Sequence, residues 1–289
     1  MRIGLIGAGH VFSYQMEVLT KLGYEVIVCD VDNSKLINIK NKVNDYRELI
    51  GKVDLVYVST PPSTHFEIIK FFLEHKVFVI SEKPLVTNSH ELNELSKLVN
   101  NNFYNIFHFA FGDEILWFKN SEYKDLIPNQ IKCYINDPYV EDFHIEDCHL
   151  SLHGSYLDET INPLSALINI YGDYLKYVSS NLIKYNGDIY DYRSYSLFKL
   201  GSIDVTVDVL WNNFNDKSKY IDIYYDDFTI RLDSMNASVI DLTHNRVLYK
   251  SNDTRMYKHY LNGLNDFIKN KSNIDISFML NREILKYRE

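Results

Sequence analysis

Two patterns of hydrophobic and polar residues follow one another along the chain. In its first part, short apolar runs rich in Val and Ile alternate with stretches of helical spacing. This alternation is typical of parallel strands joined by crossover helices. Strands are predicted at residues 2–6, 25–29, 55–59 and 77–80, with a further strand near 106–111 closing the sheet. Helices are predicted at 63–75 and 89–99.

From about residue 132 the pattern changes to two-residue alternation. Runs such as SSNLIKY, YSLFKL, SIDVTVDVLW and YIDIYY place polar side chains at every second position. This spacing predicts a large, mostly antiparallel sheet with one face open to water. Helices are predicted at 159–171 and at 257–269. We therefore expect an α/β domain over residues 1–117 and an α+β domain over residues 118–289.

Charge and composition exclude several classes of function. The net charge of −9 and the lack of a basic run argue against a nucleic-acid partner. The apolar run at residues 2–9 is too short for a signal sequence or a membrane span, so we expect a cytoplasmic protein with no membrane partner. The three cysteines, Cys29, Cys133 and Cys148, show no pair at metal-ligand spacing and are expected to be reduced thiols.

The segment IGLIGAGHVF carries the first candidate site. Gly7 and Gly9 fall at the turn between a strand and a helix, where a missing side chain lets backbone N–H groups approach a pyrophosphate. His10 and Val11 follow in the same turn and belong to the predicted cofactor site. Phe12 occupies the position of the third glycine of the dinucleotide-binding fingerprint, so the motif is incomplete. The alternative is an ordinary tight turn.

Asp30 supports the interpretation of the glycine turn as part of a dinucleotide site. It ends the second predicted strand, 23 residues after Gly7, where a carboxylate can accept both ribose hydroxyls of an adenosine and repel a 2′-phosphate. The sequence therefore predicts a Rossmann domain that binds NAD. NADP stays possible, because Lys35 could reach back to a phosphate.

The segment VDLVYVSTPPSTHFEIIKFFLEHKVFVISEKPLVTNSHEL resembles the glucose-fructose oxidoreductase and inositol dehydrogenase family (Gfo/Idh/MocA). The resemblance covers about the first hundred residues and rests on a TPPxxH-like turn and an EKP turn. It places the cofactor beside the carboxyl ends of two strands. The residues it adds to the cofactor site are Thr60, Pro61, His65, Glu82 and Lys83. It also implies a cis peptide bond before Pro84.

Lys83 is the candidate catalytic residue. At the carboxyl edge of a parallel sheet it would lie beside the cofactor. Its ammonium group could polarise a substrate carbonyl, or exchange a proton while hydride moves to or from nicotinamide, and the resemblance implies the same role. The alternative is a surface lysine in a proline turn.

A second catalytic segment of the family has a partial counterpart in DETINPLSALINIYG. Asp158 matches the first acid, but Asn162 replaces the expected histidine and Ser165 replaces the last aspartate. A helix that starts early would direct Asp158 and Asn162 toward one site, where they could position a substrate. Alternatively, Asn162 caps a helix whose first turn contains Pro163. An amide cannot exchange a proton near neutrality.

Three histidines complete the candidates. In FHFAFGDEILWF, Ala110 replaces the arginine that the family has, and His108 is a candidate substrate contact or a core residue. His149 and His153 are four residues apart, but no recognisable motif supplies a third ligand, so we predict no metal.

The leading hypothesis is an NAD-dependent oxidoreductase that acts on a secondary alcohol or ketone of a sugar, nucleotide sugar or polyol. A second hypothesis is an enzyme that retains NAD and uses it transiently, as in glycoside cleavage or epimerisation. A third is a catalytically silent nucleotide-binding sensor or assembly protein. The expected partners are a sugar-like small molecule and further copies of the chain, in a homodimer or homotetramer.

Overall fold

The computed structural model describes residues 1–172 and 174–288, and by internal contacts these divide into two units. The first unit combines Met1–Ile106 with Tyr260–Asn281. The second combines Phe107–His259 with the described residues from Arg282 onward. The boundary expected at residue 117 would give each domain one continuous segment. The first unit instead includes a segment from near the C-terminus.

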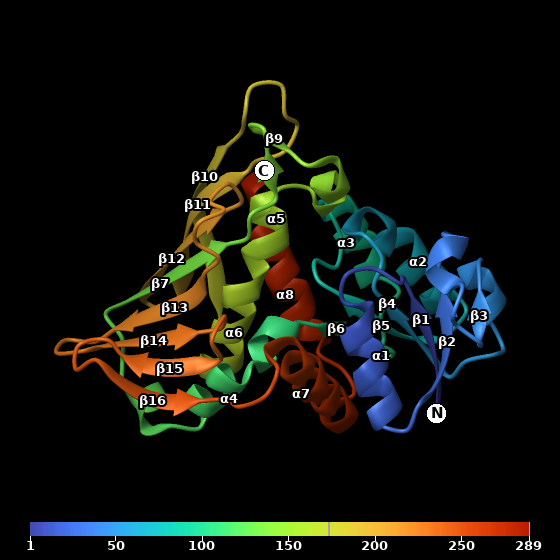
Figure 1. Cartoon of the computed structure of the whole chain (residues 1–289), viewed down its shortest axis with the longest axis horizontal. Helices are drawn as coiled ribbons and strands as arrows, with labels where there is room; N and C mark the ends of the chain where they lie inside the picture. The colour runs from blue at the N-terminus through green and yellow to red at the C-terminus, as the bar shows by residue number, and fades with distance from the viewer. Residues whose placement is uncertain (173, 289) are drawn as a thin grey trace. The chain divides into compact units, whose positions relative to one another are not determined.

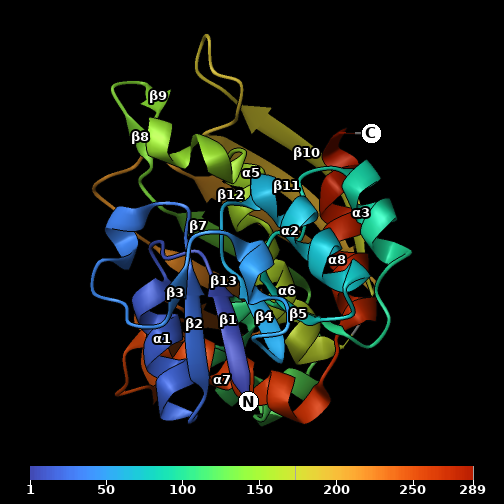
Figure 2. The ribbon, with the colours of Figure 1, turned by 90° about the vertical axis from the view of Figure 1, so that its right-hand side faces the viewer.

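A six-stranded parallel sheet forms the core of the first unit. Its strand order is β3-β2-β1-β4-β5-β6, and Figure 2 shows the first five of these from left to right. Every residue of β4 and β6 is buried, which is typical of parallel strands covered on both faces. The strands are β1 (Arg2–Ile6), β2 (Glu25–Cys29), β3 (Lys42–Val43), β4 (Leu55–Val58), β5 (Phe78–Glu82) and β6 (Phe103–Ile106).

The crossover segments make this sheet doubly wound, as expected for the predicted Rossmann domain. The chain passes from β1 toward one edge through α1, and from β4 toward the other edge through α2, so right-handed crossovers place the two helices on opposite faces. The helices are α1 (Phe12–Lys21), α2 (Pro62–Glu74) and α3 (Ser89–Ser96), with 3-10 helices η1 (Asn33–Leu36) and η2 (Tyr46–Leu49).

The predicted strand that closes the sheet is present as β6, but it lies earlier than the predicted position near 106–111. Pairing with β5 runs from Phe103 to Ile106, and the 3-10 helix η3 (His108–Phe111) follows. The run FHFAF is apolar and short, so its pattern alone does not distinguish a strand from a buried helical turn.

The C-terminal segment of the first unit packs on β5 and β6. It comes from α7 (Arg255–Asn270) and α8 (Ile274–Leu285), each of which spans both units. Phe267 lies 5.4 Å, centroid to centroid, from Phe78 and from Tyr104. The Tyr104 hydroxyl donates to Asp266 at 2.6 Å. The helix predicted at 257–269 is confirmed, whereas α8 was not predicted.

An eight-stranded, mostly antiparallel sheet forms the second unit, as expected. Its order is β10-β11-β12-β7-β13-β14-β15-β16, and the β7–β12 pair is parallel. Figure 1 shows these strands from β10 at the top to β16 at the bottom. The strands are β7 (Gln130–Asn136), β10 (Leu175–Ile183), β11 (Arg193–Leu200), β12 (Ile203–Leu210), β13 (Lys219–Tyr224), β14 (Thr229–Asp233), β15 (Ser238–Asp241) and β16 (Arg246–Lys250).

Helices cover one face of this second sheet (Figure 1). They are α4 (Asp113–Lys119), α5 (Ser155–Glu159) and α6 (Ile161–Tyr171). Burial alternates along β11 and β12, as expected for strands with one wet face. A short hairpin of β8 (Val140–Glu141) and β9 (His144–Ile145) precedes α5, and the other 3-10 helices are η4 (Glu122–Asp125), η5 (Asp147–Leu152) and η6 (Lys286–Arg288).

Candidate functional site

The glycine turn after β1 has the shape that a dinucleotide needs. Gly7 has a φ of 103°, and a Cβ atom built on it would lie 2.5 Å from the carbonyl oxygen of Ser59. Gly7 therefore lets β1 leave the sheet close to the end of β4. A Cβ atom on Gly9 would meet no atom within 4 Å, so the ring of Phe12 leaves this position open. His10 is exposed, and Val11 precedes the first residue of α1.

Asp30 is fixed at the end of β2 by the backbone. Its Oδ2 atom accepts the Ala8 N–H at 2.8 Å, and its Oδ1 atom accepts the Asp32 N–H at 2.9 Å. An ionised carboxylate has about four acceptor positions, so two are left for ribose hydroxyls. Lys35 Nζ lies 3.6 Å from Oδ2 and is half exposed. The turn and the carboxylate therefore fit a dinucleotide, and Lys35 offers a cation beside the ribose position.

The turn that carries Lys83 is fixed at three backbone positions. The Asn105 amide donates to the Glu82 carbonyl oxygen at 3.1 Å. The ring of His65 contacts the Pro84 carbonyl oxygen, and the Leu85 N–H donates to Asn281 Oδ1 at 2.9 Å. The Lys83–Pro84 bond is cis, as the family resemblance implies. Lys83 is partly exposed between these fixed positions.

Two residues of this network, Asn105 and Asn281, were not among the predicted site residues. Asn105 Oδ1 accepts from Ser277 at 3.2 Å and from Asn281 Nδ2 at 3.3 Å. Asn273 also pairs with the Asn105 backbone through both of its amide atoms. The C-terminal segment thus supports the EKP turn, and only the tertiary structure brings the two together.

The Glu82 side chain turns into the core. Its Oε1 atom accepts from the Tyr57 hydroxyl at 2.8 Å and from Gln15 Nε2 at 3.0 Å. Burial raises the pKa of Glu82, although these hydrogen bonds oppose the increase. Glu82 was predicted as a cofactor residue, and its contacts fit a residue that orients the turn.

His65 links the two family motifs. Nε2 lies 2.8 Å from the carbonyl oxygen of Thr60, and Nδ1 lies 2.8 Å from that of Pro84. Burial lowers the pKa of His65, although the two carbonyl oxygens act in the opposite direction. Thr60 is partly exposed, and Pro61 is exposed at the N-cap of α2. His65 therefore holds both turns at one edge of the sheet.

In the second unit, the predicted substrate segment is helical from its start. α5 begins at Ser155 and α6 continues from Ile161, so Asp158 and Asn162 both lie in helical backbone. The N-cap of α6 is Thr160 and Asn162 lies inside the helix, so the capping interpretation of Asn162 is wrong. The Asn162 amide donates to Glu159 Oε2 at 2.6 Å. The Ser165 hydroxyl donates to the Asn162 carbonyl oxygen, which is a hydrogen bond within the helix.

Asn162 joins a buried ion cluster that the sequence did not predict. Lys219 Nζ lies 3.2 Å from Glu159 Oε1 and forms an ion pair with Asp137. All three charged side chains are less than a tenth exposed. Burial would lower the pKa of Lys219, but Glu159 and Asp137 outweigh it and raise the pKa. Lys219 therefore stays charged between two carboxylates.

His108 pairs with a second histidine. Its Nδ1 atom lies 3.4 Å from Nδ1 of His259. Burial, Arg255 and Lys219 together lower the pKa of His259 to about 3. His259 is therefore neutral near pH 7, and its Nε2 atom has no hydrogen-bond partner among the described residues.

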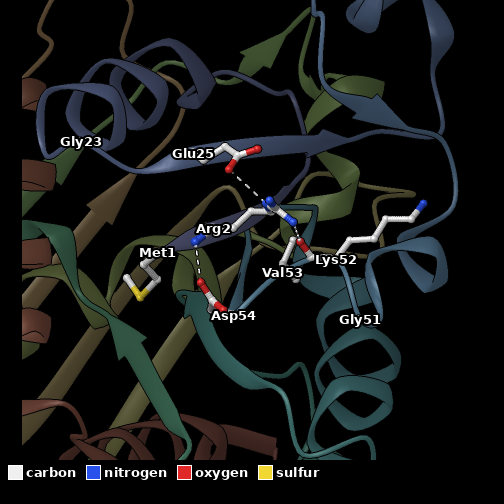
Figure 3. Close-up of a pocket in the computed structure, with 8 residues that line it drawn as sticks. All are labelled: Met1, Arg2, Gly23, Glu25, Gly51, Lys52, Val53 and Asp54. Atoms are coloured by element: carbon white, nitrogen blue, oxygen red, sulfur yellow. Dashed lines mark hydrogen bonds and ion pairs between the residues drawn. The ribbon is translucent and has the colours of Figure 1, made fainter.

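A surface hollow in the first unit lies away from these motifs. Figure 3 shows its lining at the amino ends of β1 and β2 and just before β4. Arg2 pairs there with Glu25 at 3.1 Å, and the Arg2 N–H donates to Asp54 at 2.6 Å. Ligands of open α/β sheets bind at the carboxyl ends of strands, so this hollow is not the cofactor site.

Comparison with known proteins agrees with this arrangement. The model of a family described as "Oxidoreductase family, NAD-binding Rossmann fold" (GFO_IDH_MocA) matches residues 1–104. The uncharacterized oxidoreductase YgjR of Escherichia coli is 46% identical over 41 residues, which are 14% of this chain and 12% of that relative. The chain thus aligns with only a small part of that relative's length.

Solved structures resemble the chain over its whole length, and two examples follow. A UDP-N-acetylglucosamine 3-dehydrogenase from Acidithiobacillus ferrooxidans has a TM-score of 0.81 at 15% identity, covering 100% of this chain and 96% of that one. A 3-ketoreductase from Actinomadura kijaniata, in complex with TDP-benzene and NADP, has a TM-score of 0.81 at 13% identity, with the same two coverages. At these identities the likeness shows a common fold.

Over residues 1–172 and 174–288, every helix is too short or too polar to cross a bilayer.

Proposed function

Because residues 1–104 match the model of the Gfo/Idh/MocA oxidoreductase family, described with an NAD-binding Rossmann fold, we propose the reaction of the whole chain. The chain transfers hydride between a nicotinamide cofactor and a secondary alcohol or ketone of a sugar, nucleotide sugar or polyol. The cofactor supplies the hydride chemistry. The protein supplies binding, orientation and a proton.

The observation that carries the proposal is the fixed backbone of the Lys83 turn. Contacts at Glu82, Pro84 and Leu85 hold the turn at the edge of the sheet that also bears Gly7. A catalytic group must be held within a fraction of an ångström to be effective. In this proposal the Lys83 ammonium donates its proton to the substrate oxygen during reduction, and the amine accepts it during oxidation.

The second unit is proposed to bind the substrate through Asp158, Asn162 and His108. Glu159 receives the Asn162 amide, and Lys219 holds Glu159. This arrangement fixes the orientation of Asn162. Carboxylate and amide groups can accept and donate to the vicinal hydroxyls of a polyol, which supports a sugar-like ligand.

Asn162 also supports a second candidate function. Because an amide cannot exchange a proton near neutrality, Lys83 is the proton carrier in both candidates. In the second, NAD stays bound and is reduced and reoxidised within one turnover, as in glycoside cleavage or epimerisation.

Comparison of Lys83→Ala with Lys97→Ala tests the proposal. Lys97 is an exposed lysine beyond α3 and serves as the matched control. With a panel of sugar ketones and NADH, we expect Lys83→Ala to lower turnover by about 10²-fold or more, as for loss of a general acid. NADH affinity, measured by fluorescence, should be nearly unchanged. Equal turnover in wild type and Lys83→Ala would refute the role. Sugar conversion with constant NADH absorbance would favour the second candidate.

The outer face of the second sheet is proposed to pair with another copy of the chain. Tyr134 and Tyr220 stack there with centroids 5.3 Å apart, and the Arg231 guanidinium lies 3.7 Å from the Tyr220 ring centroid. Aromatic residues and arginine are enriched at protein interfaces. Native mass spectrometry should show a homodimer or homotetramer, and Tyr220→Lys should shift it toward monomer.

A further inference from the structure

Three different metal-ligating side chains meet in the segment between β9 and α5 of the second unit. Cys148 Sγ lies 3.3 Å from His149 Nδ1 and 3.5 Å from Glu146 Oε2. His149 Nδ1 lies 3.0 Å from the same carboxylate oxygen. Glu146 and His149 are partly buried, and Cys148 is exposed. The three atoms form a compact triangle with a thiol, an imidazole and a carboxylate at its corners.

The triangle has the dimensions of one face of a tetrahedral metal site. Zinc binds sulfur at about 2.3 Å and nitrogen or carboxylate oxygen at about 2.0–2.2 Å. For tetrahedral angles these lengths require ligand atoms to be separated by about 3.3–3.6 Å. The three observed separations of 3.0, 3.3 and 3.5 Å differ from these values by a few tenths of an ångström.

The imidazole is held in this position by a neighbouring ring. His149 stacks on Tyr139, with centroids 4.0 Å apart and an interplanar angle of 11°. His153, the histidine that shares its sequence spacing, lies beside Tyr190 at 5.0 Å instead. The four-residue spacing of His149 and His153 therefore does not bring both histidines into one site. The candidate ligands all lie within residues 146–149.

We propose that Glu146, Cys148 and His149 bind a divalent metal ion of the zinc class, with the fourth position open to water or to another ligand. The mixture of thiolate, imidazole and carboxylate suits Zn²⁺ and related transition ions, whereas Mg²⁺ and Ca²⁺ prefer oxygen ligands. On binding, the Cys148 thiol transfers its proton to solvent and a sulfur–metal bond forms. The charge and oxidation state of the ion do not change.

The three ligands lie between β9 and α5, so a bound ion would affect the structure of this connecting segment. Glu146 follows β9 directly, and the 3-10 helix η5 that contains Cys148 and His149 leads to α5. An ion held by all three residues would fix the segment that leads into α5, which bears Asp158 and Glu159. The site itself does not depend on the proposed oxidoreductase activity.

Titration of the full chain with CoCl₂ tests the proposal directly. Co²⁺ bound through a thiolate gains a charge-transfer absorption that sites with only oxygen and nitrogen ligands lack. We expect this absorption to saturate at a single equivalent of Co²⁺ and to disappear when ZnCl₂ is added, because zinc competes for the same ligands. MgCl₂ should leave it unchanged. If the absorption does not develop in the wild-type chain, the proposal is overturned.

Three single variants distinguish metal binding by all three side chains from metal binding by the exposed Cys148 thiol alone. Cys148→Ser should abolish the charge-transfer band, and His149→Ala and Glu146→Gln should each weaken Zn²⁺ binding by at least about tenfold, since even indirect support of a metal ligand is worth that much. His153→Ala is the matched control and should bind as wild type does. Loss of binding in Cys148→Ser alone, with full affinity in both other variants, would identify adventitious thiol binding and overturn the proposal. Circular dichroism of each variant checks that it is folded.

Discussion

The ring of His65 lies 2.8 Å from the carbonyl oxygen of Pro84, and through its other nitrogen it reaches Thr60 at the same distance. One buried imidazole therefore connects the TPP turn at the start of α2 with the turn that presents Lys83. The connection makes the geometry of the two motifs interdependent.

Replacement of His65 by alanine should affect both stability and catalysis. The change leaves one carbonyl oxygen without its donor, since a neutral imidazole has a single N–H, at a cost of about 1–3 kcal/mol in the free energy of unfolding. It also frees the Lys83 turn, so kcat should fall further than NADH affinity does. Urea denaturation and steady-state kinetics measure these effects. His75→Ala, at the exposed end of α2, should change the free energy of unfolding by no more than about 0.5 kcal/mol. Equal effects of the two variants would contradict the bridging role.

Lys219→Met should be among the most destabilising single changes in the second unit. It leaves Glu159 buried without its cation and takes from Asp137 its buried partner, and breaking such a buried pair costs about 3–5 kcal/mol. Lys217→Met provides the control, because Lys217 lies 3.3 Å from the same Asp137 but its side chain is 52% exposed. Exposed pairs are worth about 0–1 kcal/mol. Thermal unfolding of the two variants side by side would show the difference, and similar melting temperatures would argue against a buried cluster.

Asp30 and Lys35 should together determine the cofactor preference. Asp30→Asn removes the charge that repels a 2′-phosphate, so NADPH affinity should rise relative to NADH by about tenfold, or about 1.4 kcal/mol. Lys35→Ala should weaken NADPH binding and leave NADH binding unchanged. Fluorescence titrations with both cofactors measure the ratio. Asp32→Asn, an exposed N-cap two residues away, is the control. An unchanged ratio in Asp30→Asn would show that this carboxylate does not meet the ribose.

His259 should make the protein sensitive to acid. Its pKa is lowered from 6.5 to about 3 in the folded chain, so the unfolded chain takes up a proton first as the pH falls. The stability that depends on a neutral His259 is complete above about pH 6.5 and decreases by about 1.4 kcal/mol per pH unit down to about pH 3. His259→Gln should flatten the dependence of the unfolding free energy on pH over this range. The exposed His90→Gln should keep the wild-type slope, and parallel curves for all three proteins would refute the assignment.

The sequence predicted the features that local pattern determines. Strands β1, β2, β4 and β5, the glycine turn, the position of Asp30 and the cis bond at Pro84 follow from periodicity and from the family resemblance, and the structure has them, whereas the short strand β3 was not predicted. The apolar run from Phe107 to Phe111 was assigned wrongly, because aromatic runs are compatible with strands and with buried helical turns.

Local sequence patterns did not predict the contacts between residues that are distant along the chain. Asn281 lies 196 positions from Leu85, and Lys219 lies 60 positions from Glu159. No sequence motif links the two residues of either pair, and nothing in the segment around each residue indicates its partner. The ion cluster and the support of the Lys83 turn therefore became visible only in three dimensions.

The division of the first unit between the two ends of the chain bears on how the protein is made. Asn105 obtains its partners Asn273, Ser277 and Asn281 only after the ribosome has synthesised residues that lie 168 to 176 positions further along the chain. During translation the first unit is consequently incomplete, and it stays open to chaperones and proteases until α7 and α8 emerge. Expression of residues 1–106 alone should for the same reason yield an aggregation-prone fragment.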